Sequence, residues 1–275
     1  VDDCSIDDSV AMVIKDFPTV RVIRNKTNIG YSKSYNIGTK QTKGRYILHL
    51  NSDITFENAI PLDNLIQYMD AHPTIGIAGC KLLKLNDTLD FPCKRSFPTI
   101  SSVLFQSFGL SMLFSKNTLF GQYYLTYLDE NKIHEVDCLM GAFMLIRREV
   151  VENIGLLDEQ FFIYGEDIDY CLRTKQNGWK IIYYPKIIAK HYHGGTTHQT
   201  RWKHIVRFHT AMLQYYRKHY WNKKSLLIHI MVIFGIGIRF LGVMMINVLV
   251  IYGDYFRMKL IWKENVRKGS RSSSL

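Results

Sequence analysis

Short apolar runs rich in β-branched residues alternate with helical patterns over the first 83 positions of the chain. The runs at 19–25, 46–51 and 75–79 have the length and composition of buried strands. Between them, the segments at about 32–42 and 61–71 repeat apolar positions at helical spacing. This alternation predicts an α/β fold with a mostly parallel sheet, whose strands are joined by crossover helices.

A stretch without regular periodicity interrupts this pattern at residues 84–132. It carries Pro92, Pro98, Gly109 and Gly121 amid aromatic residues, and we interpret it as a long excursion that could cover a site. Periodicity returns beyond it. We predict strands at 139–146, 180–184 and 187–192, and helices at 148–154 and about 167–176.

One apolar segment, residues 226–252, is long enough to cross a bilayer, which takes about 20 residues. Arg239 lies near its middle, where an arginine costs roughly 2.5–3.5 kcal/mol on insertion scales, and basic residues flank both ends. Because basic flanks favour the cytoplasmic side, both ends of the segment should stay on that side. We therefore expect a monotopic or re-entrant helix rather than a single span. A buried core helix or a dimerisation helix is the alternative.

The composition is that of a folded protein, but its charge is unevenly spread. The 275 residues are 47% hydrophobic and 21% charged, which excludes a disordered chain. Residues 201–275 hold 14 Lys and Arg against two acids, a net charge of +12, whereas residues 1–200 hold 21 basic and 22 acidic residues. A basic segment around an apolar run indicates an anionic membrane surface as a partner, and no nucleic acid. Six aromatic residues at 202–221 keep a nucleic-acid binder as a weaker alternative.

These patterns divide the chain into four expected parts. A folded domain covers 1–200, a basic aromatic juxtamembrane segment 201–224, a hydrophobic membrane-associated helix 225–252 and a basic tail 253–275. The five cysteines are widely spaced and include no C-x-x-C pair, so they indicate neither a zinc site nor a disulfide framework. A reducing cytoplasm fits this cysteine usage best.

The first candidate for chemistry is the pair Asn51 and Asp53, which follows the apolar run at 46–50. Side chains at the carboxyl end of a parallel strand project into the crevice where open α/β sheets bind ligands. Asp53 can ligate a hard divalent ion, and Asn51 can orient a ribose hydroxyl or a metal-bound water. A plain turn with no ligand is the alternative interpretation.

The second candidate places three acids, Glu166, Asp167 and Asp169, at the amino end of a predicted helix. The apolar run at 161–164 precedes them, and an apolar wall raises a carboxylate's affinity for a proton enough for general-base work. Acids in a first helical turn also stabilise the helix by themselves. Catalysis and helix stabilisation therefore both remain open at this point.

A third candidate is the sequence His-Tyr-His-Gly-Gly-Thr at 191–196, at the end of a predicted strand. A histidine on a glycine-rich loop can bring its imidazole to a metal ion or a diphosphate. Strand-end histidines without a function are the alternative interpretation.

Taken together, these motifs resemble the family 2 glycosyltransferases of the GT-A fold, and within them the rhamnosyltransferase-like branch. The resemblance covers about residues 1–200, and several separated motifs agree in order and spacing. The matching segments are VDDCSIDDS at 1–9, NIGYSKSYNIG at 28–38, GRYILHLNSD at 44–53, the long segment at 141–173 and HYHGGT at 191–196.

The resemblance implies a role for each matching residue. Asp167 would be the catalytic base with Glu166 as its neighbour, and Asp53 would hold Mg²⁺ or Mn²⁺ on the donor diphosphate. His191 is the favoured second metal- or diphosphate-contacting residue, with His193 as the competing choice. The nucleotide sugar would contact Asp2, Asn28, Gly30, Asn36, Asn51 and Asp53, and the acceptor sugar would lie beside Gly141 and Ala142.

The family likeness also implies an activity. We expect an inverting, metal-assisted transfer of a sugar, with L-rhamnose as one candidate, from a nucleoside-diphosphate donor to a growing polysaccharide or a lipid-linked glycan acceptor. The expected location is the cytoplasmic face of the bacterial inner membrane. Within the protein, Asp53 and Asp167 should face each other across one cleft. The alternative is a catalytically inactive binding or scaffolding protein attached to the membrane.

One departure from the family concerns the start of the sequence. In the family a strand precedes the turn at Asp2, and the sequence given starts at this turn. We therefore expect an upstream piece to be missing, which would leave the sheet without one strand and the nucleotide site without one wall.

Overall fold

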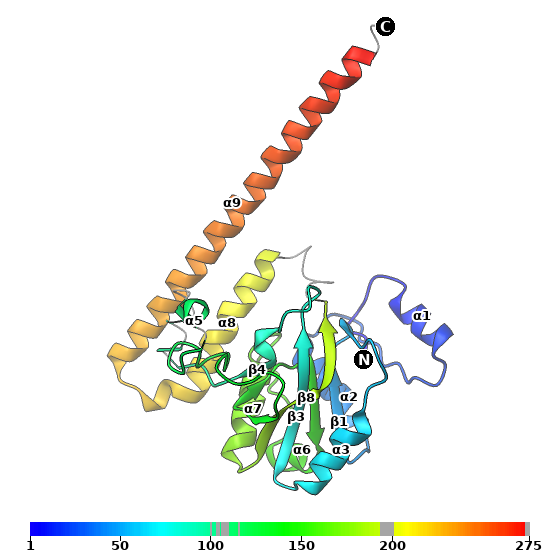
Figure 1. Cartoon of the computed structure of the whole chain (residues 1–275), viewed down its shortest axis with the longest axis vertical. Coiled ribbons are helices and arrows are strands. Elements are labelled where there is room, and N and C mark those ends of the chain that lie inside the picture. Colours follow the sequence, from blue (N-terminus) through cyan, green and yellow to red (C-terminus); the bar gives the residue numbers. More distant parts are fainter. Residues whose placement is uncertain (100, 103–104, 106–109, 115, 193–200, 273–275) are drawn as a thin grey trace.

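The computed structural model describes residues 1–99, 101–102, 105, 110–114, 116–192 and 201–272. The histidine at 193 and the glycine-rich sequence that follows it lie outside the described residues, so of the two candidate histidines the structure describes only His191. Figure 1 shows a central sheet with helices around it, and a long helix that projects far beyond this body.

The main sheet has the strand order β1-β7-β3-β8-β2, and β5 also pairs with β8. Strands β3 and β8 run parallel, while β7 lies antiparallel between β1 and β3. Strands β1, β3 and β8 therefore point in one direction, and their carboxyl ends meet at one edge of the sheet. The strands are β1 (Tyr46–Leu50), β2 (Ile54–Thr55), β3 (Ile75–Leu83), β5 (His134–Glu135), β7 (Phe143–Arg147) and β8 (Lys180–His191).

The expectation of a mostly parallel sheet is wrong, because the sheet is mixed. Strand β7 enters from the excursion and not from a crossover helix, so it is inserted between β1 and β3 in the reverse direction. Hydrophobic periodicity does not reveal this, since a buried strand has the same pattern in either direction.

Two predicted strands differ from the structure. The run at 19–25 forms only an isolated bridge between Asp2 and Arg24, and Val20 in it is 52% exposed, so the run lacks a buried face. The two strands predicted at 180–184 and 187–192 form the single strand β8. It continues past Pro185 because the register slips there, from Tyr184 opposite Cys80 to Ile188 opposite Lys81, and the proline needs no backbone donor in a bulge.

The predicted helices in the first 176 residues all form. They are α2 (Tyr31–Lys40), α3 (Leu62–Ala71), α6 (Arg148–Ile154) and α7 (Glu166–Gln176). A further helix, α1 (Ser9–Asp16), was not predicted; it buries no residue and stands off the body on the side away from α5 and the turn between α8 and α9.

Where the structure describes the excursion, its elements are short. They are η1 (Phe91–Cys93), β4 (Lys94–Arg95) and α5 (Leu110–Leu113), and β4 pairs with β6 (Cys138–Leu139). Most of the core lies around β3, β7 and β8, whose buried apolar side chains form one continuous cluster with those of α3 and α7. Burial of this cluster supplies the main stabilisation of the fold.

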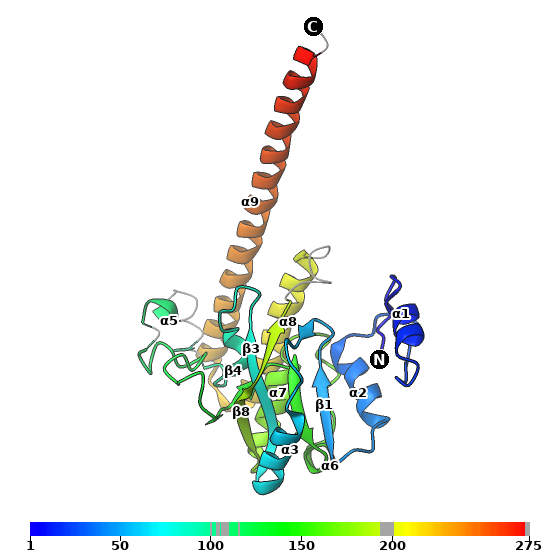
Figure 2. The same cartoon turned by 45° about the vertical axis from the view of Figure 1, so that its right-hand side comes forward.

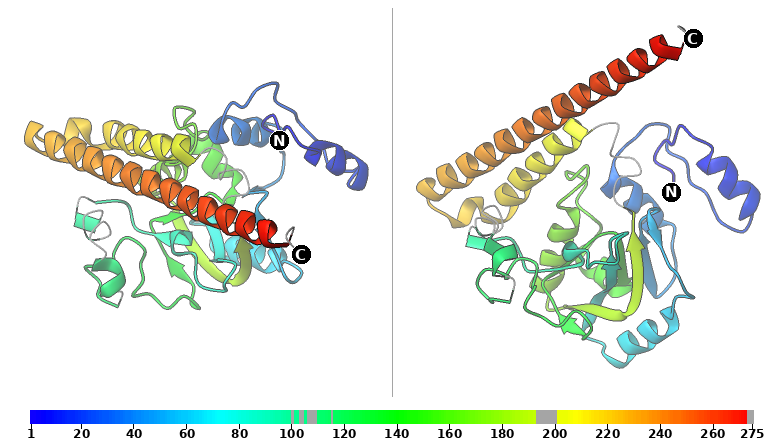
Figure 3. Two further views of the ribbon diagram at one scale, coloured as in Figure 1. Left: turned by 90° about the horizontal axis from the view of Figure 1, so that it is seen from above. Right: turned by 45° about the horizontal axis from the view of Figure 1, so that its top comes forward.

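The C-terminal part is a helical hairpin, seen beside the body in Figures 2 and 3. It consists of α8 (Arg201–Tyr220), η3 (Trp221–Lys223) and α9 (Leu226–Ser272). Helix α8 packs on the body through Ala211 and Tyr215, which form a small apolar cluster with Phe161. The expected juxtamembrane segment is therefore a helix docked on the folded body, and part of its aromatic surface is buried.

Helix α9 has an outward apolar surface. Residues Leu226–Val250 form a stretch long and apolar enough to cross a membrane, and only 11% of its most apolar window is buried. Arg239 points towards α8: one of its guanidinium nitrogens lies 3.2 Å from the Met212 Sδ, and the guanidinium stands 5.0 Å from the centre of the Phe208 ring. The one arginine of the apolar stretch therefore faces the protein.

Candidate active site

The topology gathers the predicted site residues at the carboxyl edge of β1 and β8. Asn51 follows β1, and His191 ends β8. Strand β7 runs the other way, so the residues just before it, Gly141 and Ala142, lie at the same edge; the Asn51 amide donates to the Ala142 carbonyl over 3.0 Å. This is the edge at which open α/β sheets bind ligands.

Three side chains form what we call the sheet-edge group: Asp53, Asp90 and His191. The Nε2 of His191 lies 3.4 Å from the Asp53 Oδ1, and its Nδ1 donates to the Asp90 Oδ2 over 3.0 Å. Burial lowers the pKa of His191, but its hydrogen bonds to the two carboxylates and their negative charges raise it, to about 9. The imidazole is therefore charged at neutral pH. Asp53 remains 31% exposed, whereas the side chains of His191 and Asp90 are buried.

The sheet-edge group suits a divalent ion with few protein ligands. The 3.4 Å between the Asp53 Oδ1 and the His191 Nε2 is close to the roughly 3 Å that separates neighbouring ligands about 2.1 Å from an octahedral ion. Asp90 holds the other ring nitrogen, as supporting carboxylates do at metal-binding histidines. In the described part of the chain, no three or more His, Cys, Asp or Glu side chains are arranged as a ready metal cage. An ion held here would thus keep open coordination positions for substrate phosphates and water.

The second cluster, the α7 group, consists of Glu166, Asp167 and Asp169. Its helix starts after two residues in the left-handed conformation, Tyr164 at φ 71° and Gly165 at φ 81°. A non-glycine residue in this region is strained, and such strain is often found at functional sites. The tight turn brings the first turn of α7 against β6 and the Gly141 turn.

Asp167 is held by donors from three places. The Arg95 Nη2 donates to its Oδ2 over 2.6 Å, the Gly141 amide donates to the same oxygen over 3.3 Å, and the Ile168 amide donates to its Oδ1 over 2.8 Å. The side chain of Asp167 is 12% exposed. Its carboxylate is thus fixed in orientation while part of it still reaches the surface.

Glu166 and Asp169, the neighbours of Asp167, have opposite environments. Glu166 is 6% exposed, and burial, followed by the negative charge of Asp167, raises its pKa to about 8. Asp169 is fully buried and forms ion pairs with Arg173, Lys218 and His219. Burial raises the pKa of Asp169, but these three partners lower it, to about 2. Asp169 therefore ties α8 to α7 and is not available to a substrate.

Two tyrosines of α2 link Asn51, beside the sheet-edge group, to Gly141, beside the α7 group, and sequence reasoning missed both. Tyr31 and Tyr35 stack with ring centres 4.1 Å apart. The Tyr35 hydroxyl donates to the Asn51 Oδ1 over 2.9 Å, and the Tyr31 hydroxyl donates to the Gly141 carbonyl over 2.8 Å. Since Gly141 also contacts Asp167, a continuous chain of contacts joins the Asn51 end to the Asp167 end. The spacing of four between the tyrosines, just after Gly30, was the available signal.

The residues predicted to contact the nucleotide lie along the start of the chain and α2. Asp2 accepts from the Ser5 amide and pairs with Arg24, and Asn28 is exposed. Asn36 is 2% exposed and its amide group bonds to the Leu157 backbone and to Glu159, so it fastens α2 to that loop.

Asp3, which sequence reasoning did not select, fixes the turn before α2. Its carboxylate accepts from the amides of Ile29 and Gly30, both over 2.9 Å. Gly30 has φ 92°, and a Cβ there would lie 2.6 Å from the Phe162 carbonyl oxygen, so only glycine fits. Asp3 and Gly30 therefore set the position of Tyr31.

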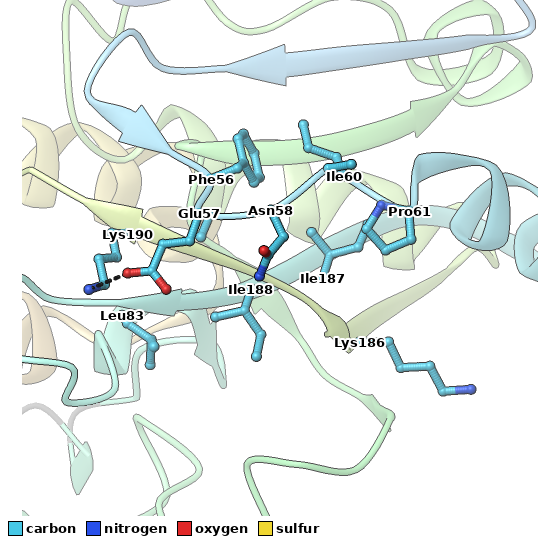
Figure 4. Close-up of a pocket in the computed structure, with 12 residues that line it drawn as sticks. Phe56, Glu57, Asn58, Ile60, Pro61, Leu83, Lys186, Ile187, Ile188 and Lys190 are labelled. Atoms are coloured by element: carbon cyan, nitrogen blue, oxygen red, sulfur yellow. Dashed lines mark ion pairs between the residues drawn. The ribbon is translucent and has the colours of Figure 1, made fainter.

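A pocket of about 400 Å³ lies between the loop after β2 and strand β8 (Figure 4). Its wall is mostly aliphatic, with the Glu57 and Lys190 ion pair of 2.6 Å on one side and Lys186 on another. None of the predicted site residues lines it. We assign no substrate to this pocket, because neither the sheet-edge group nor the α7 group lines it.

The fold and these two clusters place carboxylates and a histidine at the ligand-binding edge of an α/β sheet, as an enzyme of this fold class requires, and comparison with known proteins gives the family. The sequence pattern of the family described as "Glycosyltransferase like family 2" matches residues 2–212. The chain belongs to this family of glycosyltransferases.

Named relatives agree with this membership. The chain is 23% identical over 221 residues to the N-acetylglucosaminyl-diphospho-decaprenol L-rhamnosyltransferase of Mycobacterium tuberculosis, a match that covers 76% of this chain and 71% of the relative. It is 30% identical over 176 residues to the rhamnosyltransferase WbbL of Escherichia coli K12, which covers 59% of this chain and 61% of the relative.

A solved structure shows the same fold. The mannosyltransferase PcManGT of Pyrobaculum calidifontis, in complex with GDP-Man and Mn²⁺, superposes with a TM-score of 0.51 at 14% identity; the match covers 82% of this chain and 55% of that one. The expected GT-A α/β fold with flanking helices is therefore confirmed.

Proposed function

We propose that this glycosyltransferase moves a sugar from a nucleoside diphosphate to an acceptor hydroxyl in one displacement that inverts the anomeric carbon, with Asp167 as general base. The observation that carries this proposal is the chain of contacts from Asn51 through Tyr35, Tyr31 and Gly141 to Asp167. It fixes the candidate base relative to the edge where a diphosphate would bind.

The reaction needs a base on one side of the sugar and charge stabilisation on the other. Asp167 takes the proton of the acceptor hydroxyl while the acceptor oxygen bonds to the anomeric carbon and the bond to the diphosphate breaks. Attack from the side opposite the leaving group inverts the configuration. Hydrogen bonds from Arg95, Gly141 and Ile168 keep the carboxylate aimed, so no reorientation is needed during the step.

Asp53 and His191 would hold Mg²⁺ or Mn²⁺ on the donor side. A bound divalent ion supplies positive charge next to the leaving diphosphate. The His191 ring is charged without a metal, so it would have to release a proton in order to hold an ion through Nε2. Asp90 keeps the ring oriented through Nδ1 in either state.

For the substrates we propose L-rhamnose as the donor sugar and a lipid-linked glycan as the acceptor. The proposal is supported by two relatives named as rhamnosyltransferases, one of which is named for a decaprenol-diphosphate-linked sugar. It also agrees with the exposed apolar side of α9 next to the basic α8, which would hold the enzyme on the anionic cytoplasmic face of a membrane.

The test uses the full chain and Asp167→Asn. We expect a panel of dTDP-L-rhamnose, UDP-glucose, UDP-N-acetylglucosamine and GDP-mannose to show turnover with dTDP-L-rhamnose, and EDTA to abolish it.

Asp167→Asn should lose turnover by about 100- to 10,000-fold, the usual contribution of a general base, while donor binding persists. The matched control is Asp63→Asn, an exposed acid in the first turn of α3, which should keep full activity. Wild-type turnover in Asp167→Asn contradicts the proposal.

A further inference from the structure

The excursion at 84–132 contacts the α7 group through the side chain of Arg95. Strand β4, which carries Arg95, pairs with β6 immediately before the Gly141 turn. The Arg95 side chain is 9% exposed, and its Nη2 donates both to the Asp167 Oδ2 over 2.6 Å and to the Leu139 carbonyl over 2.8 Å. A buried arginine is thus fixed to the backbone by one bond and to the candidate base by the other.

We propose that Arg95 is a positioning residue for the general base: it locks one oxygen of the Asp167 carboxylate so that the other is presented to the acceptor hydroxyl. The inference rests on the proposed role of Asp167. It gives the excursion, which has no periodic structure of its own, a definite part in the reaction.

The hydrogen-bond arrangement supports this division between the two oxygens. Oδ2 accepts from both Arg95 and Gly141, so both of its lone pairs are used. Oδ1 accepts from the Ile168 amide alone among the described residues and keeps a lone pair. Without Arg95, the carboxyl group would be free to rotate away from this orientation, and neither oxygen would stay aimed at the acceptor hydroxyl. A misplacement of about 1 Å can cost about 100-fold in rate.

The neighbouring residue offers a matched control. Lys94 is also buried on β4, 1% exposed, and its ammonium donates to the Leu125 carbonyl over 2.7 Å. It carries the same charge as Arg95 but does not contact Asp167. Removing either cation leaves buried carbonyls without their donor and costs stability, whereas only Arg95 should affect the chemical step.

The experiment compares Arg95→Met, Arg95→Lys and Lys94→Met in the full chain, using the nucleotide sugar that the donor panel selects. We expect kcat to fall about 100-fold in Arg95→Met with the donor KM unchanged. In Arg95→Lys it should fall only about tenfold, because an ammonium restores the charge but not the fork of the guanidinium. Lys94→Met should lose thermal stability and keep the wild-type kcat.

The outcomes separate this inference from the proposed function. If Asp167→Asn is inactive and Arg95→Met matches Lys94→Met in kcat, the positioning role is wrong while the base assignment stands. If Asp167→Asn keeps full turnover, the base assignment fails and the role of Arg95 fails with it. Should Arg95→Met fail to fold, Arg95→Lys decides: a wild-type kcat in that variant overturns the inference, and a tenfold loss at constant KM supports it.

Discussion

The sheet-edge group and the α7 group lie near each other but are built in opposite ways. Asp53 of the sheet-edge group is 31% exposed and stands 3.4 Å from the His191 ring. Asp167 of the α7 group is 12% exposed and accepts hydrogen bonds from Arg95, Gly141 and Ile168. The bond from Arg95 is only 2.6 Å long. The first carboxylate can exchange partners, and the second is held in place.

This difference matches two separate tasks in glycosyl transfer. A donor-side carboxylate has to take up an ion and a diphosphate and release them in every cycle, which suits an open group with replaceable partners. A general base has to meet a hydroxyl at a fixed distance and angle, which suits a preorganised group. The comparison fits the proposed roles of Asp53 in binding and Asp167 in chemistry, and the variants described next test each side of it.

The largest effect on donor binding is expected at Asp53. Asp53→Ala removes the exposed carboxylate of the sheet-edge group, so the metal-dependent part of nucleotide binding should disappear. We expect the loss in affinity with Mn²⁺ to exceed the roughly 10- to 100-fold that removal of a supporting residue costs. Isothermal titration of the nucleotide with Mn²⁺ and with EDTA measures it. Asp167→Asn is the control and should bind as the wild type does; an unchanged affinity in Asp53→Ala would remove the metal assignment.

The next effect concerns stability, at Asp169. Asp169→Asn removes a fully buried carboxylate that binds Arg173, Lys218 and His219, but these cations are partly exposed, so water compensates some of the loss. We expect the free energy of unfolding to fall by about 2 kcal/mol. Urea denaturation monitored by circular dichroism measures it. Asp63→Asn, on an exposed helix start, should change stability by less than about 0.5 kcal/mol.

The same variant has a pH signature. The pKa of Asp169 is lowered in the folded state to about 2, from a usual value of 3.8, so its contribution to stability is complete above pH 4 and is lost as the pH falls towards 2. The difference in unfolding free energy between the wild type and Asp169→Asn should therefore be constant from pH 5 to 7 and shrink below pH 4. A difference that stays constant down to pH 2 would mean that Asp169 acts through packing and not through its charge.

Sequence patterns identified the candidate residues at the ends of strands and helices, but not the contacts that these residues make. Asp53, Asp167 and His191 each stand at the end of a strand or helix, and an element's end can be recognised from its own neighbours in the sequence. The direction of β7 could not be found in this way, because a buried strand shows the same apolar run in both directions. Periodicity therefore predicted the helices of the body and the buried strands, but not the strand order.

Arg95, Asp90 and the two tyrosines of α2 show what else was missing. Arg95 and Asp90 lie in the excursion, where no periodic pattern indicates a neighbour, and their partners are 72 and 101 positions away in the chain. Tyr31 and Tyr35 share a helix face, but only the folded structure shows that Asn51 and Gly141 lie beside their hydroxyls. Contacts of this kind depend on tertiary structure and leave no signal in one sequence.

A smaller effect is expected at Asp90, which supports the sheet-edge group from behind. Asp90→Asn keeps the size of the side chain but removes the negative charge that His191 contacts through Nδ1. Because loss of a supporting carboxylate costs about 10- to 100-fold in metal affinity, we expect about a tenfold weaker Mn²⁺-dependent nucleotide affinity and little change in binding with EDTA. Titration under both conditions measures it. Equal loss under both conditions would show that Asp90 supports the fold and not the ion.

The smallest effect tests the connection between the two groups. Tyr35→Phe removes the hydroxyl that bonds to Asn51, and Tyr31→Phe removes the one that bonds to Gly141, while both keep the stacked rings. One neutral hydrogen bond contributes about 1 kcal/mol, so the kcat/KM of each variant should fall about fivefold. We expect the loss to fall on the donor KM in Tyr35→Phe, because Asn51 lies on the donor side, and on kcat in Tyr31→Phe, because the Gly141 amide holds Asp167. Steady-state kinetics of the two variants gives this split directly. If both variants lose the same parameter, the two clusters act as one unit, and the division between a binding side and a chemical side has to be abandoned.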